Sequence, residues 1–124
     1  MEKTAAQKLG LKPGEALQVV QPVPGWQGML EPLPEGARVV QDGADVVLMF
    51  CRDRAGMEAA LPGFAVLAQP GVRLWLAYAK LTSPLAGELS RAVVHDLVPA
   101  YGLDVVSQIA LDGDWSAMRV KRLG

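Results

Sequence analysis

The six residues Val46–Cys51, VVLMFC, are apolar at every position. A strand with one solvated face alternates apolar and polar residues, so an unbroken apolar run predicts a strand that is covered on both faces. Strands of this kind lie in the centre of parallel sheets, with helices packed on either side. A second buried strand is predicted at Val72–Ala79, one helical segment later. Together the two segments predict an α/β domain.

The rest of the chain alternates strand and helix signals around this centre. Ala16–Val20 and Ala37–Val40 predict two earlier strands, while Asp104–Leu111 and Trp115–Leu123 predict two later ones. The last two are separated by Asp112–Asp114, a hairpin turn sequence. Strands that alternate with helices are joined by right-handed parallel crossovers. We therefore predict a three-layer, Rossmann-like, mostly parallel sheet of about six strands with a C-terminal antiparallel hairpin.

Helix signals separate the predicted strands. Short helices are predicted at Thr4–Leu9 and at Trp26–Glu31, each closed by glycine or proline. Asp53 is a candidate cap for a third helix, in which Pro62 predicts two short pieces or a kink. A serine followed by proline is a favoured helix start, so the fourth helix is predicted over Ser83–Pro99.

Length and composition predict one soluble domain over residues 1–124. The 124 residues are 51% hydrophobic and 20% charged, which excludes intrinsic disorder. The net charge of −1 gives no basic excess for nucleic acid or an anionic membrane. The apolar runs are too short to span a bilayer, and the first residues, Met1–Ala5, lack the apolar core of a signal peptide. A cytoplasmic protein is the simplest expectation.

The chain holds one cysteine and one histidine. A disulfide framework, a cysteine-based zinc site and a His-rich metal site are therefore excluded within one chain. Cys51 ends the most apolar strand and is expected to be an inert core thiol. His95 and Asp96 are adjacent on a predicted helix, where such neighbours point apart, so they form no dyad. We predict no catalytic residue, no metal and no cofactor.

Two turn segments resemble parts of class I methyltransferases. Leu9–Gly14, LGLKPG, is similar to their lead-in to the first strand, and Ala68–Leu76, AQPGVRLWL, is similar to their turn into a late central strand. A closer resemblance, over nearly the whole chain, is to a bacterial family known as domain of unknown function 3052, a reduced relative of the methyltransferase-like fold. The matching segments are Lys8–Gly14, Leu30–Gly36, Ala59–Pro62 and Asp114–Ser116, of which the Trp-Ser pair is the most specific. The family implies a fold but no activity.

The segment after the first strand departs from the methyltransferase pattern. A cofactor loop there uses glycines and backbone N–H donors to approach the ligand. Here Gln21–Gly28 reads QPVPGWQG, and Pro22 and Pro24 remove two donors. The one candidate for a carboxylate that would hold a ribose at the end of the second strand is Asp42, which is more simply part of a turn.

Ligands of open α/β sheets bind beyond the carboxyl ends of the strands. The residues that the predicted topology brings there are Gln21–Trp26, Gln41, Asp42, Arg52, Asp53, Lys80–Ser83 and, from the closing hairpin, Asp112 and Asp114–Ser116. If the last strand pairs with Val72–Ala79, Trp115 lies close to Lys80. The candidate ligand- or partner-binding residues are Trp26, Arg52, Asp53, Lys80, Ser83, Trp115 and Ser116.

Each candidate also has a purely structural explanation. Lys80 could contact an anionic ligand, or it could be solvated or paired with a nearby aspartate. Trp115 could be a stacking platform, or it could close one end of the core. Ser116 has no base assigned to it, and Asp53 is most simply a helix cap.

These observations favour a non-catalytic interaction or regulatory module that lacks the cofactor loop. Its partner would be an unidentified protein or a second copy, since an apolar patch around Trp26 and Trp115 would suit a homodimer. The alternative is an S-adenosylmethionine- or nucleotide-binding protein, or a methyltransferase-like enzyme, that uses the same strand ends. An open crevice between the first and fourth strands would favour the ligand, and a filled one the module.

Overall fold

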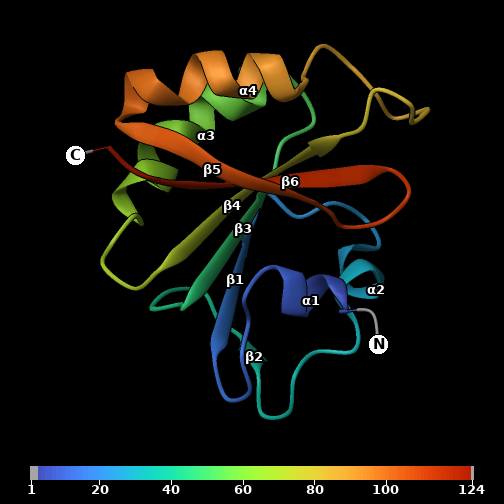
Figure 1. Ribbon diagram of the computed structural model, residues 1–124, viewed down its shortest axis with the longest axis vertical. Coiled ribbons are helices and arrows are strands. Elements are labelled where there is room, and N and C mark those ends of the chain that lie inside the picture. The colour runs from blue at the N-terminus through green and yellow to red at the C-terminus, as the bar shows by residue number, and fades with distance from the viewer. Residues whose placement is uncertain (1–2, 124) are drawn as a thin grey trace.

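The computed structural model describes residues 3–123, which form a six-stranded sheet with helices on both faces (Figure 1). The strands lie in the order β2-β1-β3-β4-β6-β5. Their bounds are β1 Ala16–Val20, β2 Arg38–Val39, β3 Val46–Phe50, β4 Arg73–Ala79, β5 Leu103–Ala110 and β6 Trp115–Arg122. The helices are α1 Ala5–Lys8, α2 Trp26–Leu30, α3 Arg54–Val66 and α4 Arg91–Leu97, with a 3₁₀ turn at Val98–Tyr101.

The sheet is parallel except for β6. The pairs β1–β2, β1–β3 and β3–β4 are parallel, whereas β6 runs antiparallel to both β4 and β5. In this register Ala79, the last residue of β4, lies opposite Trp115, the first residue of β6. The predicted Rossmann-like sheet, its six strands and its closing hairpin are therefore confirmed. None of the helices among residues 3–123 could cross a bilayer, since the longest, α3, has 13 residues.

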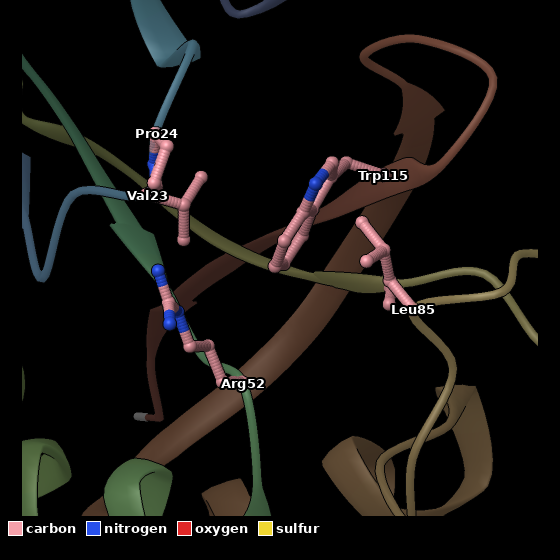
Figure 2. A pocket seen from close by; sticks show the side chains of 6 residues that line it. Val23, Pro24, Arg52, Leu85 and Trp115 are labelled. Carbon is pink, nitrogen blue, oxygen red and sulfur yellow. The ribbon is translucent and has the colours of Figure 1, made fainter.

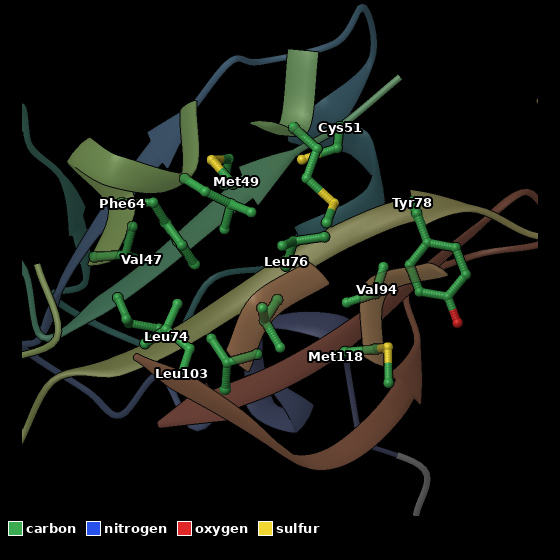
Figure 3. Packing of buried hydrophobic residues seen from close by; sticks show 14 of the residues in the cluster. Val47, Met49, Cys51, Phe64, Leu74, Leu76, Tyr78, Val94, Leu103 and Met118 are labelled. Carbon is green, nitrogen blue, oxygen red and sulfur yellow. The ribbon is translucent and has the colours of Figure 1, made fainter. Parts of the chain in front are cut away.

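The predicted central strand β3 is buried along its whole length, and its alternate side chains enter two separate cores. Val47, Met49 and Cys51 pack with α3 and α4 (Figure 3), whereas Leu48 and Phe50 pack with α1 and α2 on the opposite face. Because neither face meets water, no polar residue is tolerated in the strand, which explains the unbroken apolar run.

Two of the predicted helix caps are present. Thr4 accepts a hydrogen bond from the Gln7 amide and completes a capping box, and Asp53 accepts one from the Gly56 amide at 2.6 Å. Of the two alternatives predicted at Pro62, the division into two short pieces is wrong, because α3 is one helix from Arg54 to Val66, and a kink stays a prediction. Pro62 is exposed, so water can reach the helix carbonyl whose donor the proline removes.

The predicted start of the fourth helix is also wrong. Helix α4 begins at Arg91, seven residues after Pro84, and Ser90 caps it by accepting a hydrogen bond from the Val93 amide. Ser83 has a different role: its hydroxyl donates to Asp114 at 2.8 Å and accepts from the Leu85 amide at 3.0 Å. A serine that bonds locally stabilises a turn as readily as a helix start, and here the long-range partner Asp114 decides between them.

The second strand is shorter than predicted, and this moves Asp42 away from the strand ends. β2 contains only Arg38 and Val39, which lie opposite the first two residues of β1. The chain then turns back, and Asp45 bonds to the amide of Ala16 at 2.9 Å. Asp42 therefore lies near the amino end of β1, in a bend between β2 and β3, which agrees with the simpler expectation that it belongs to a turn and not to a ribose site.

An ion pair fastens the N-terminal segment to the sheet. Arg73, at the start of β4, donates to Glu15 at 2.8 Å and to the carbonyl of Gly10 at 2.6 Å. Both side chains are mostly buried, with 16% of Arg73 and 23% of Glu15 exposed. The hydrogen bond from Arg73 holds the pKa of Glu15 below its ordinary value of 4.5. Unpairing the two side chains would leave charges without compensation in a poorly solvated place.

We predict that Glu15→Gln lowers the free energy of unfolding at pH 7. The difference in this free energy between the variant and the wild type should become smaller in acid. A carboxyl with a lowered folded-state pKa adds stability above its unfolded pKa near 4.5 and loses it as the pH falls through the folded value. Urea midpoints at pH 7 and pH 3.5 measure both effects. Glu58→Gln is the control, because its ion pair with Arg54 is largely solvated and should contribute little. If the difference in urea midpoint between Glu15→Gln and the wild type is the same at pH 7 and pH 3.5, the lowered pKa of Glu15 is contradicted.

Candidate functional site

An apolar cavity of about 360 Å³ opens at the carboxyl ends of β1, β3 and β4 (Figure 2). We call it the strand-end cavity. Its lining comes from the loop after β1, the segment between β3 and α3, the end of β4, the loop after β4 and the start of β6. The lining residues are Val23, Pro24, Arg52, Ala79, Leu85 and Trp115. The crevice between the first and fourth strands is therefore open, which is the outcome that favours a ligand.

The hairpin between β5 and β6 positions Trp115. The carboxylate of Asp112 accepts hydrogen bonds from the amides of Asp114 and Trp115, both at 2.8 Å, which closes the turn. The indole packs edge-on against Phe50, with ring centroids 5.3 Å apart. Trp115 is only 5% exposed, so it closes the core and also presents one surface to the cavity. Removing it would cost about 3–5 kcal/mol of stability.

Leu85 reaches the cavity from the irregular segment between β4 and α4, residues 80–90. Two polar contacts hold this segment across the strand ends. One is the bond between Ser83 and Asp114, and the other is the Glu88 carboxylate, which accepts from the Arg54 amide at 2.9 Å. Leu85 remains 56% exposed although it lines the cavity. An exposed leucine beside a tryptophan is an apolar surface available to a bound molecule.

Arg52 is the charged member of the lining, and its side chain extends toward Val23 and Pro24, across the cavity from Trp115 (Figure 2). It takes part in neither ion pair of residues 3–123, which join Arg54 to Glu58 and Arg73 to Glu15. Arg52 also lines a smaller neighbouring cavity of about 230 Å³ with Gln21 and Pro22. A guanidinium so placed can donate to an anion in either space.

The other sequence candidates have structural partners. Lys80 donates its ammonium to the carbonyl of Asp112 at 2.7 Å, which is a backbone contact and not the predicted aspartate side chain. Asp53 caps α3, and Ser83 holds the loop after β4. Trp26 is half-buried against the core under α1 and α2, outside the lining of the strand-end cavity. Ser116 is buried on β6, opposite Tyr78 of β4.

The loop after the first strand, Gln21–Trp26, is expected at the strand ends from the strand order, and it contains the lining residues Val23 and Pro24. Two lining residues, Ala79 and Leu85, are outside the predicted set. Leu85 falls in the predicted fourth helix, Ser83–Pro99, but the helix there does not begin until Arg91. The one usable signal was position, because Val23 and Pro24 follow β1 and Ala79 ends β4, and the carboxyl ends of parallel strands share one side of the sheet.

Cys51 directly precedes Arg52 in the chain, but its thiol is buried in the core. Burial raises its pKa to about 12, and the nearby charge of Asp53 adds to the shift. A thiol with this pKa holds almost no thiolate at neutral pH, so it cannot serve as a nucleophile for the cavity. Within residues 3–123, no group of three or more His, Cys, Asp or Glu side chains is arranged to hold a metal ion.

We predict that Cys51 in the folded protein does not react with dithionitrobenzoate at pH 8 over an hour. Both its burial and its raised pKa, about 12, oppose formation of the thiolate. Absorbance of the released thionitrobenzoate measures the reaction. The same protein in 8 M urea is the control and should react within minutes. Rapid modification without urea would show that the thiol is accessible and ionised.

Neither a family model nor a curated protein sequence matches the chain. Membership of the family resembled in sequence, domain of unknown function 3052, therefore stays a prediction. Solved structures do match along most of the chain.

Mitomycin 7-O-methyltransferase MmcR superposes with a TM-score of 0.59 at 14% identity, over 96% of this chain and 53% of that one. The fold is methyltransferase-like. A protein of the NADB-Rossmann superfamily from Streptococcus agalactiae matches with a TM-score of 0.57 at 10% identity, over 99% of this chain and 69% of that one. DhpI, in a complex with SAM and HEP, matches with a TM-score of 0.56 at 11% identity, over 94% of this chain and 84% of that one.

These identities show a shared fold alone, and the chain spans about half the length of the mitomycin enzyme. Rossmann-like sheets bind ligands at the carboxyl ends of the strands, which is where this cavity lies. The DhpI complex contains SAM, and the residues around this cavity decide whether the same molecule fits here.

Two observations argue against that fit. In the loop after β1, Pro22 and Pro24 have no N–H, and the Trp26 amide already donates to the carbonyl of Val23 at 3.2 Å. Secondly, β2 ends opposite Leu17, so it brings no carboxylate to the cavity for ribose hydroxyls. The residues around the cavity do not match what a nucleoside cofactor needs from this fold.

We predict that titration calorimetry with S-adenosylmethionine and with its demethylated product shows no micromolar binding, because the loop donors and the ribose carboxylate are missing. Micromolar affinity for either compound would overturn this assessment of the cavity and support a nucleoside-binding protein. Pro24→Gly is a useful companion variant, since it returns one N–H to the loop. Its affinity for both compounds should remain weak, because the carboxylate is still absent.

Proposed function

We propose that this protein binds a small organic molecule in the strand-end cavity. The observation that carries the proposal is the open space between the loop after β1 and the end of β4, walled by Trp115 and Leu85. Cavities of a few hundred Å³ with mostly apolar walls and a few polar groups are the common form of small-molecule sites.

The methyltransferase-like fold supports this proposal over a module without a ligand. The similar solved structures include methyltransferases and a complex that contains SAM. An open cavity at the strand ends is the outcome that favours a bound molecule, whereas a filled crevice would have favoured the module. The proposal keeps the ligand-binding part of the alternative and its location at the strand ends.

The residues that line the cavity can position a bound molecule and exclude water from it. They do not form an assembled set of reacting groups. Arg52 is the charged side chain among the lining residues that the structure describes, and arginine is not a general base at neutral pH. We therefore propose binding as the function of this cavity, without assigning a reaction to it.

Leu85→Gln should weaken binding of the neutral fluorescent probe N-phenylnaphthylamine about fivefold, because an apolar wall is replaced by an amide of similar size. Saturable fluorescence enhancement measures the dissociation constant. Leu81→Gln is the matched control: Leu81 is 69% exposed on the same loop but does not line the cavity, so binding should be unchanged. Equal losses in both variants, or no saturable binding by the wild type, would refute the proposal.

A further inference from the structure

The charge in the strand-end cavity restricts what it can bind. The cavity combines the small exposed part of the Trp115 indole, an aliphatic wall, Leu85, and one cation, Arg52. We infer that its ligand is an amphipathic organic anion, namely a flat apolar ring system that carries a carboxylate, phosphate or sulfonate. This inference rests on the proposed function and adds the chemical class of the ligand.

The Arg52 guanidinium is free to bind, because it has no ion-pair partner among residues 3–123. The carboxylates to consider are Asp53, the next residue in the chain, and Glu88, which contacts Arg54. Asp53 is held at the start of α3 by the Gly56 amide, and Glu88 is held there by the Arg54 amide. Both carboxylates are therefore fixed on backbone N–H groups of α3, and the donors of Arg52 remain available.

Covering the Arg52 guanidinium without giving it an acceptor costs free energy. A neutral apolar molecule in the cavity would displace water from part of the guanidinium and give no acceptor in return. An anionic group restores the lost hydrogen bonds, and the planar fork of arginine can hold both oxygens of such a group at once. The same molecule can place its ring against the indole of Trp115, which lies across the cavity from Arg52 (Figure 2).

The other cation near the strand ends, Lys80, does not line the cavity. The Lys80 ammonium donates to the carbonyl of Asp112, in the turn of the hairpin that carries Trp115. A ligand anion is therefore expected at the Arg52 side of the cavity, with the apolar body toward Trp115 and Leu85. The separation of the cation from the apolar side chains therefore sets the orientation of the ligand as well as its charge.

Two fluorescent probes with the same ring body separate charge from apolar contact. Anilinonaphthalene sulfonate is an anion, and N-phenylnaphthylamine is its neutral counterpart without the sulfonate. The wild type should bind the sulfonate at least about tenfold more tightly, which is the low end of the effect of a charge-assisted hydrogen bond. Arg52→Gln should remove most of this preference and leave binding of the neutral probe within about twofold of the wild type.

Arg52→Lys should recover only part of the preference, because an ammonium keeps the charge but loses the planar fork. Arg54→Gln is the matched control, since Arg54 is an exposed arginine two residues away that pairs with Glu58 and does not line the cavity. It should leave both affinities unchanged. Thermal melts should show that Arg52→Gln folds normally, because the side chain is exposed.

The outcomes distinguish this inference from the proposed function. Equal binding of the two probes, or equal losses in Arg52→Gln and Arg54→Gln, would overturn the inference, while sensitivity of the neutral probe to Leu85→Gln would leave the proposed function standing. If Leu85→Gln changes the binding of neither probe, the cavity is not the binding site and both proposals fail.

Discussion

The antiparallel pairing of β6 with β4 is the constraint on which the candidate site depends. Because β6 runs against the parallel strands, its first residue meets the last residue of β4, and Trp115 lies opposite Ala79. A parallel strand in the same position would place its first residue at the other end of the sheet. The reversal brings an aromatic side chain to the strand ends, where the loops after β1, β3 and β4 leave space.

The loops around this point are stiff and poor in donors, which gives the cavity its chemical character. Prolines follow β1, while the segment after β4 is held by Ser83 and Glu88. Backbone N–H groups, the usual means by which Rossmann-like sheets hold phosphates and nucleosides, are scarce here. In the proposed site, recognition would then rely on apolar contact and on the guanidinium of Arg52. The cavity lies where Rossmann-like sheets bind ligands, but its lining has a different chemistry.

Local signals predicted most of the elements, and failed where a distant contact decided between two local possibilities. The run Val46–Cys51 requires cover on both faces, and the cap at Asp53 was correctly assigned because its partner, Gly56, is three residues away. Ser83, followed by proline, looks like a helix start, yet its hydroxyl bonds to Asp114, 31 positions along the chain. The end of β2 also depends on a distant contact, since Asp45 bonds to Ala16 and turns the chain back early.

The sequence by itself determined the layers, the buried centre of the sheet and the closing hairpin, because apolar periodicity and turn chemistry act over a few residues. It also placed Arg52 and Trp115 at the strand ends, since the ends of strands follow from their order. Only the tertiary structure decided that these ends enclose a cavity, that Leu85 forms its wall and that Asp42 lies elsewhere. The strand-end cavity is bounded by residues from five separate segments. The distances between these segments are set by strand register and packing, which no local sequence pattern encodes.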